Sequence, residues 1–200
     1  NAQVDSNLAL PTYGRARTLG WLMGSSRAFW DPFLAALRSD AALRSVENPV
    51  ERFVMDSVGG IQRELSSRSE ARYAHETAPG RLVAMQRLAQ VAHLAWLAPC
   101  NLSIHPTFGP WIALRAVLVV DQDGPLTVAR DWEPPCTACA SACAPALARA
   151  LCAVAPRPTW GPWLEVRDAC PLGREHRYGE AQIHYHYSKD RAALLRLLDT

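Results

Sequence analysis

The residues of this sequence best suited to metal chemistry are cysteines, and three of the six stand close together. Cys136, Cys139 and Cys143 follow the pattern C-x2-C-x3-C in a proline-rich stretch, and Cys170, which precedes Pro171, is a candidate fourth ligand. Thiolates at this spacing bind iron–sulfur clusters or zinc. The pattern leaves three alternatives open: a metal centre, reduced or redox-active thiols, and disulfides, the last of which are rare in a cytosolic protein.

Arginine supplies nearly all the positive charge, since Lys189 is the single lysine. Arg115 lies within an otherwise apolar segment, where an unpaired guanidinium would be costly to bury. We therefore expect Arg115 to have an anionic partner, and its planar fork suits a carboxylate or a phosphate. An ordinary salt bridge within the protein is the alternative to a ligand.

The histidines do not form a recognisable catalytic or metal-binding pattern. His184 and His186 are two residues apart, so on a helix they point to different faces, and we interpret both as structural. His105 stands directly before Pro106, where hydrogen bonds to neighbouring backbone are its favoured role. The sequence also lacks a Ser/His/Asp arrangement, a glycine-rich phosphate loop and an H-E-x-x-H motif. We therefore predict a function that depends on binding rather than on a side-chain nucleophile.

Length and composition indicate a folded domain that spans residues 1–200. Apolar residues make up 49% and charged residues 20%, which excludes the disordered class. The net charge of +2, with acidic residues scattered along the chain, does not suggest nucleic acid as a partner. Apolar runs are too short to span a bilayer, so we expect no membrane partner and a cytoplasmic location.

The hydrophobic pattern predicts an α+β domain, an α/β sandwich. Strands are expected at 18–23, 71–76 and 111–120, the last as a buried central strand. Helices are expected to begin near Phe29 and to span 49–65, 81–97, 145–154, 178–187 and 191–198, with a Trp- and Pro-rich loop at 156–163. The helix 81–97 should be the centre of the core, with Leu82, Met85, Leu88, Val91, Ala92 and Trp96 facing inward.

Residues 104–115, I-H-P-T-F-G-P-W-I-A-L-R, resemble the I-H-P-x-F-G-x-W-x-A-x-R stretch of the CblC family of cobalamin-processing proteins. A second match is Arg167-Asp168-Ala169 followed by residues 177–182, R-Y-G-E-A-Q, which are similar to the R-D-A and R-Y-S-E-x-Q elements of that family. The resemblance implies a nitroreductase-like central sheet flanked by helices. It also implies that cobalamin is bound base-off and loses its upper axial ligand, by reductive decyanation or by glutathione-dependent dealkylation.

The resemblance, together with the character of the residues, predicts two sets of site residues. A corrin needs apolar walls and a few polar groups at its rim. The residues expected around cobalamin are Gln90, His93, Ser103, Ile104, His105, Phe108, Trp111 and Ile112. Those expected to bind the carboxylates of glutathione, by their match to arginines of the family, are Arg115, Arg167 and Arg191. The family tends to carry a histidine where Gln90 stands, and a shift of one turn would bring in His93 instead.

Several alternatives remain open from the sequence. The co-substrate is either glutathione or a reduced flavin. The chain is either a cobalamin upper-ligand reductase or dealkylase, or a non-catalytic corrinoid chaperone. The cysteine group is similar to that of epoxyqueuosine reductases and reductive dehalogenases, which implies an iron–sulfur corrinoid reductase as a third function. The fold without its pocket is a further alternative, and both a monomer and a homodimer are compatible with the sequence.

Overall fold

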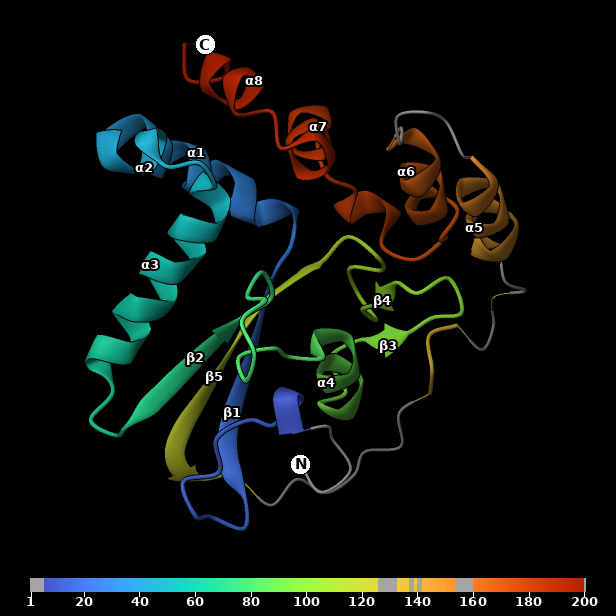
Figure 1. Cartoon of the computed structure of the whole chain (residues 1–200). Coiled ribbons are helices and arrows are strands. Elements are labelled where there is room, and N and C mark those ends of the chain that lie inside the picture. Colours follow the sequence, from blue (N-terminus) through green and yellow to red (C-terminus); the bar gives the residue numbers. More distant parts are fainter. Residues whose placement is uncertain (1–5, 126–132, 137–138, 140–141, 154–159, 200) are drawn as a thin grey trace.

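The protein is built around a three-stranded antiparallel sheet that carries helices on both faces (Figure 1). The computed structural model describes residues 6–125, 133–136, 139, 142–153 and 160–199. The strand order is β1-β5-β2, from Thr18–Ser25 (β1), Ala113–Asp123 (β5) and Ser69–Tyr73 (β2). A separate small sheet pairs Trp96–Leu97 (β3) with Ser103–Ile104 (β4). This confirms the predicted mixed fold with a central sheet.

The helices surround the sheet in chain order. They are α1 (Trp30–Ser39), α2 (Ala41–Ser45), α3 (Pro49–Glu64), α4 (Met85–Val91), α5 (Cys143–Cys152), α6 (Gly161–Asp168), α7 (Glu180–Ser188) and α8 (Arg191–Arg196). Short 3-10 helices lie at Ser6–Leu8 (η1), Arg27–Phe29 (η2) and Arg174–His176 (η3). Within the described residues, no helix combines the length and apolar character that crossing a membrane would require.

The central strand β5 is apolar on both faces because each face is covered. Leu118 and Val120 pack toward α3, against Val54 and Val58, whereas Val117 and its neighbour Val119 pack toward α4 and Met85. A strand buried on both faces reads as a continuous apolar run rather than an alternating one. The predicted strand 111–120 is therefore confirmed, although it begins two residues later and extends to Asp123.

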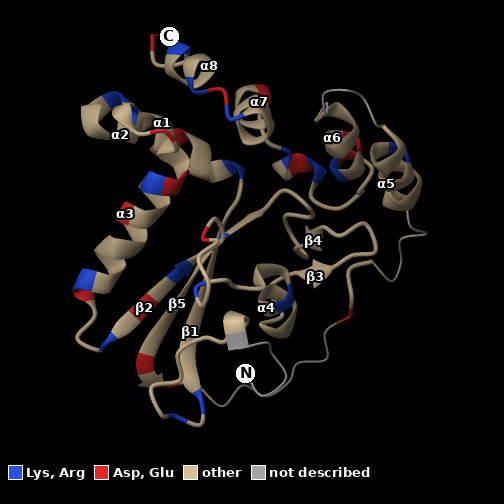
Figure 2. Ribbon diagram, viewed as in Figure 1, with Lys and Arg blue, Asp and Glu red and all other residues tan. Residues whose placement is uncertain are grey.

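Helix α3 agrees closely with the helix predicted at 49–65. Pro49 occupies its first turn, where the missing N–H is not needed, and the buried face is Val50, Val54 and Val58. Charges of both signs lie along its exposed side, as they do along β2 (Figure 2). Basic and acidic residues are thus interspersed on this part of the surface.

The helix predicted at 81–97 is wrong in its extent. Helix α4 ends at Val91, His93 adopts a left-handed backbone conformation with φ 53°, and the chain turns into β3. Val91 is 79% exposed, and Trp96 pairs with Ile104 in the small sheet. Ala95, which follows the turn, is fully buried. The packing gained by turning the chain here outweighs the helical periodicity of the sequence.

The C-terminal third of the chain forms a helical layer beside the sheet. Helices α5 and α6 pack against each other, and α7 and α8 continue toward α1 and α3 (Figure 1). Helix α6 was not predicted. Pro162 at its start fits the first turn, so residues 161–163 of the loop predicted at 156–163 are helical, whereas residues 156–159 lie outside the described part of the chain.

Candidate ligand site

The segment that carries the strongest sequence motif forms a closed reversal, here called the aromatic turn (residues 105–109). The backbone of His105 and that of Gly109 exchange two hydrogen bonds of 2.9 Å. The His105 Nδ1 atom accepts hydrogen bonds from the backbone N–H groups of Thr107 (3.0 Å) and Phe108 (3.2 Å). Burial lowers the pKa of His105, and the nearby His176 lowers it further. His105 is thus a neutral structural group of the turn.

The aromatic turn is held against the C-terminal layer by direct contact between two backbones. A Cβ atom on Gly109 would lie 2.0 Å from the carbonyl oxygen of Leu172, and one on Gly173 would lie 2.3 Å from the carbonyl carbon of Phe108. Both glycines also have positive φ, 54° and 65°. Only glycine permits both this approach and this conformation. We call this contact the glycine crossing.

The residues predicted around cobalamin differ widely in exposure. Ile104 and Trp111 are each 1% exposed, so they support the site from beneath rather than present a free surface. Phe108 is half-buried between the rings of His105 and His176, each with its centroid 4.8 Å away. Ile112 is also half-buried.

Two further predicted residues lie on α4 and just beyond it. Helix α4 packs against β3 and β4, so half-buried Gln90 stands in the same part of the molecule as Ser103. The Ser103 hydroxyl oxygen is buried and has no hydrogen-bond partner among the residues that the structure describes. Such atoms are rare because leaving them unpaired is unfavourable. His93 is exposed in the turn after α4, so it does not share a helix face with Gln90.

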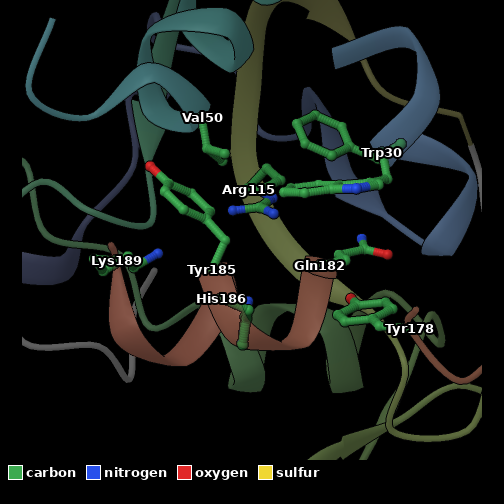
Figure 3. Close-up of a pocket in the computed structure, with 9 residues that line it drawn as sticks. Trp30, Val50, Arg115, Tyr178, Gln182, Tyr185, His186 and Lys189 are labelled. Carbon is green, nitrogen blue, oxygen red and sulfur yellow. The ribbon is translucent and has the colours of Figure 1, made fainter. Parts of the chain in front are cut away.

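A second feature is a pocket of about 300 Å3, including its open mouth, between α7 and the start of α1. We call it the Arg115 pocket (Figure 3). Its lining residues come from four segments of the chain: Phe29, Trp30, Val50, Arg115, Tyr178, Gln182, Tyr185, His186 and Lys189. None of these nine described residues is acidic, and the two basic ones are Arg115 and Lys189. Lys189 forms a salt bridge with Glu51 (3.7 Å), so Arg115 is the lining cation that an anionic group would pair with.

Arg115 projects from β5 into this pocket without a carboxylate partner among the described residues (Figure 3). Its Nε atom donates to the Ser25 hydroxyl (2.9 Å), and its guanidinium carbon lies 5.2 Å from the ring centroid of Phe29. Burial lowers the pKa of the guanidinium. The expectation of an anionic partner is thus not met within the described protein, and a ligand carboxylate would supply one.

The other two predicted arginines lie next to the pocket rather than in its lining. Arg167 stands 6.0 Å from the ring centroid of Tyr178, which lines the pocket, and its Nη1 atom is buried without a hydrogen-bond partner among the described residues. Arg191 donates to the backbone carbonyl of Arg44, and its Nε atom is buried and has no partner in the described part of the chain. Neither arginine forms a salt bridge with a described carboxylate.

The α7 side of the pocket carries polar side chains that are uncharged at neutral pH. His186 has its pKa lowered to about 3 by burial and by the charges of Arg167, Lys189 and Arg115. The Gln182 side-chain oxygen is buried, and no described residue donates a hydrogen bond to it. Burial raises the pKa of Tyr185 to about 12, so its hydroxyl remains a donor. The pocket thus offers neutral hydrogen-bonding groups beside cations.

Sequence reasoning missed the contribution of α7 to this pocket. Tyr178 and Gln182 lie within the motif at 177–182, but the motif assigned them no role. His186 was interpreted as purely structural because it stands two residues from His184. His184 is exposed and His186 lines the pocket, so the two histidines do lie on different faces of α7. The face that carries His186 is the one that reaches the pocket.

Three of the four cysteines predicted as metal ligands lie in one hydrophobic cluster, but the four are not at ligating separation. Cys143 and Cys170 are buried in it, with Cys136 packed against them. All six cysteines are free thiols. Among the described residues, no three histidine, cysteine or carboxylate side chains stand close enough to surround one metal ion.

The comparisons with known proteins identify the fold. No family model matches the sequence, and no curated protein matches it either. Among solved structures, the chain is similar to the C. elegans B12-trafficking protein CblC, a homologue of human MMACHC. The TM-score is 0.70 at 19% sequence identity, and the match covers 96% of this chain and 83% of the other. The chain therefore has a CblC-like fold.

Proposed function

We propose that this protein binds cobalamin and removes its upper axial ligand, with a thiol as co-substrate. The CblC-like fold and the motif at 104–115 support the corrinoid as ligand. The observation that carries the proposal is the Arg115 pocket, where a desolvated guanidinium lacks a carboxylate partner among the described residues. Buried cations without partners are unfavourable, so such a site favours binding of an anion.

The corrinoid would lie against the aromatic turn. Half-buried Phe108 and Ile112 offer apolar surface for the corrin, and the unpaired Ser103 hydroxyl and Gln90 offer hydrogen bonds to its amide rim. Ile104 and Trp111, buried beneath, would keep this wall rigid. His93 and His105 are the weaker members of the predicted set, because the first is exposed and the second is engaged in the turn.

The thiol would lie in the Arg115 pocket with its carboxylates on arginine. Arg115 reaches the cavity directly, and the unpaired nitrogen atoms of Arg167 and Arg191 lie beside it. Glutathione is the favoured co-substrate because its carboxylates match guanidinium groups, the use that the resemblance to the CblC family implies for these arginines.

The chemistry would then depend on orientation. The thiolate sulfur attacks the upper-ligand carbon, a new S–C bond forms, and the electron pair of the broken Co–C bond stays with cobalt. The protein holds the two reactants at short distance and in line, which by itself accelerates a bimolecular step. Because His186 is neutral, it adds no positive charge to the lining. The binding of the carboxylates therefore does not require this histidine to take up a proton.

Titration with cyanocobalamin and methylcobalamin, followed in the visible spectrum, tests corrinoid binding. We expect saturable binding with the shift that accompanies displacement of the lower nucleotide base. A spectrum that does not change at high corrinoid concentration would overturn the proposed function. It would mean that the fold is retained without the pocket.

Product analysis separates catalysis from delivery. With glutathione present under anaerobic conditions, methylcobalamin should yield S-methylglutathione, and cyanocobalamin should release cyanide when a reductant is added. Base-off binding without either product would indicate a non-catalytic corrinoid chaperone. A requirement for protein-bound iron would instead indicate an iron–sulfur corrinoid reductase.

Replacement of Arg115 tests the thiol site. The variant Arg115→Met keeps most of the apolar stem but removes the charge, so we expect thiol-dependent turnover to fall about 10- to 100-fold, the loss of one charge-assisted interaction. Corrinoid affinity should be unchanged. Arg115→Lys should recover part of the activity by lowering the KM for thiol, since a point charge replaces a bidentate fork.

A matched control is Arg52→Met, because Arg52 is an exposed arginine paired with Asp56 four residues away on α3. Its replacement should leave both turnover and corrinoid binding unchanged. Unchanged turnover in Arg115→Met, with intact corrinoid binding, would exclude the role of Arg115.

A further inference from the structure

Gln182, in the first turn of α7, is a buried amide side chain whose oxygen atom receives no hydrogen bond from a described residue. Two side chains with a charged or amide group are buried in the described part of the chain: Arg72, 8% exposed, and Gln182, 6% exposed. Arg72 is paired, since it donates to the Glu70 carboxylate and to the backbone carbonyl of Gly80. Gln182 differs, because its Oε1 atom is buried and has no donor among the described residues.

The burial of this amide is unfavourable for the protein without a ligand. A buried acceptor that loses its water and gains no donor destabilises the folded state, whereas an apolar side chain of the same shape does not. A residue that only filled space at this position would therefore be more stable as methionine. A ligand that brings an N–H group to the Oε1 atom of Gln182 would remove the penalty, so this position is suited to recognition.

Gln182 faces the Arg115 pocket together with other residues of one side of α7. Tyr185, His186 and Lys189 follow it by three, four and seven residues, a spacing that places all four on the same face of the helix. Arg115 reaches the same pocket from β5 (Figure 3). The pocket thus combines a guanidinium without a carboxylate partner among the described residues and a neutral acceptor without a donor, supplied by two different elements.

These two groups match a carboxylate that has an N–H donor on the neighbouring carbon. Both ends of glutathione have this arrangement, but the donor at the glycine end is a neutral amide, whereas the donor at the γ-glutamyl end is an ammonium. An ammonium requires an anionic partner when it leaves water, and none of the nine described lining residues is acidic. Glu51, which pairs with Lys189 (3.7 Å), is not among them. The lining therefore favours the neutral amide.

We propose that Gln182 determines which end of the thiol enters the Arg115 pocket, by accepting a hydrogen bond from the amide N–H of a C-terminal glycine whose carboxylate is bound by Arg115. This inference rests on the proposed function, because it assigns the orientation of the thiol co-substrate. The ligand class is peptides that end in cysteinylglycine. The γ-glutamyl end then lies outside the lining, and the cysteine sulfur lies between the two.

Calorimetric titration of the methylcobalamin-loaded, unmodified protein with S-methylated peptides tests the orientation without differences in thiol reactivity. S-methyl-N-acetylcysteinylglycine, which lacks the γ-glutamyl end, should bind with nearly the affinity of S-methylglutathione. Esterification of the glycine carboxylate should weaken binding by about 10-fold or more. Replacement of glycine by glycolate removes only the amide N–H, and it should weaken binding by about 5- to 30-fold.

The outcomes separate this inference from the function on which it rests. If the glycine ester and the glycolate analogue bind as well as S-methylglutathione while methylcobalamin is still demethylated by glutathione, the orientation is wrong and the proposed function stands. If none of the peptides binds and glutathione supports no turnover, both are overturned.

The variant Gln182→Met tests the residue itself, because it keeps the shape of the side chain and removes the acceptor. We expect the KM for glutathione to rise about 5- to 30-fold with kcat unchanged, and the glycolate analogue to bind as well as S-methylglutathione. The midpoint of thermal unfolding should rise by about 2 to 4 °C, because a buried unpaired polar atom is lost.

The matched control is Gln122→Met, since Gln122 is exposed and donates to the hydroxyl of Ser67 (2.8 Å) far along β5 from the pocket end. It should leave the KM and the discrimination against glycolate unchanged. A lower unfolding midpoint in Gln182→Met, with an unchanged KM for glutathione, would show that the amide has a structural role and would overturn the proposal.

Discussion

His186 is the residue whose charge depends most strongly on the folded environment. It lies in the Arg115 pocket, edge-on to the ring of Tyr178 at 5.9 Å, and near three cations. Its pKa in the folded protein is about 3, compared with about 6.5 for an unperturbed histidine. The folded state therefore disfavours the protonated form.

This difference predicts how stability changes with pH. The unfolded chain takes up a proton at His186 below about pH 6.5, whereas the folded chain does so only near pH 3. The contribution of neutral His186 to stability is therefore fully present above about pH 6.5 and is lost as the pH falls from there toward 3. Between pH 7 and pH 5 the free energy of unfolding should decrease by about 2 kcal/mol on this account. Urea unfolding at several pH values measures it.

The variant His186→Gln should show a shallower decrease over this range, because the titrating group is gone while a hydrogen-bonding side chain remains. His184→Gln controls for removing an exposed histidine from the same helix. Identical pH dependence in His186→Gln and the unmodified protein would show that His186 does not carry the effect.

The site residues show what can be inferred from sequence at this scale. The expectation that Arg115 has an anionic partner follows from a charge within an apolar strand, and the structure shows no salt bridge between Arg115 and a described carboxylate, so a ligand as its partner stays a prediction. The positions of Gln182 and Lys189 could not be inferred, because they reach the pocket from α7 and its end through long-range packing. Residue type predicts a requirement, but only the fold identifies its neighbours.

At the scale of elements, α8 is the clearest case of a short helix stabilised by packing. It has six residues, too few for an isolated helix in water, and Leu194 is 1% exposed against α1 and α3. The helix also has a side-chain cap, since Asp190 accepts from the N–H of Ala193 (2.9 Å). Its stability therefore depends on one buried side chain.

Replacing this side chain tests the dependence. Leu194→Ala should reduce the free energy of unfolding by about 2 to 5 kcal/mol, because it removes buried methyl groups and leaves a cavity. Leu151→Ala, at a position 61% exposed on α5, is the control and should change stability by less than about 0.5 kcal/mol. Equal effects in thermal unfolding would contradict the assignment of α8 as docked.

The prediction of elements was accurate where local pattern and tertiary packing agree. Strands β1 and β5 and helix α3 lie where apolar runs and Pro49 predict them, whereas β2, predicted at 71–76, is shifted to Ser69–Tyr73 because the chain turns after Tyr73. The helix predicted at 81–97 was too long because Leu88, Ala92 and Trp96 satisfy a helical period, whereas α4 ends at Val91 and Trp96 lies half-buried in β3. Periodicity reports which residues are apolar, and different backbones can bury the same set.

At the scale of the whole molecule, the glycine crossing joins the aromatic turn to the C-terminal layer. It connects residues about 65 positions apart, 108–109 and 172–173, by backbone contact alone. Side-chain repacking cannot relieve a clash there. The relative placement of the two proposed ligand sites, the aromatic turn and the Arg115 pocket, therefore depends on this contact.

Substitutions at the crossing should be strongly destabilising. Gly109→Ala and Gly173→Ala each place a methyl group within 2.5 Å of backbone atoms, so we expect a loss of about 3 kcal/mol or more, or failure to fold. Gly80→Ala is the matched control, because Gly80 has φ 72° with open space around it. It should show only the backbone strain, about 1 kcal/mol.

Chemical denaturation of the three variants measures these values. If Gly109→Ala were no less stable than Gly80→Ala, the two backbones could not lie in contact in solution. The comparison isolates steric conflict from conformational preference, which a single substitution cannot do.

The crossing also has an evolutionary consequence. Each glycine is required because the other segment leaves no room for a side chain. A substitution at one position is therefore compatible with the fold only if the other segment moves away. In a set of related sequences, positions 109 and 173 should thus be glycine together or vary together, even though they stand in different motifs.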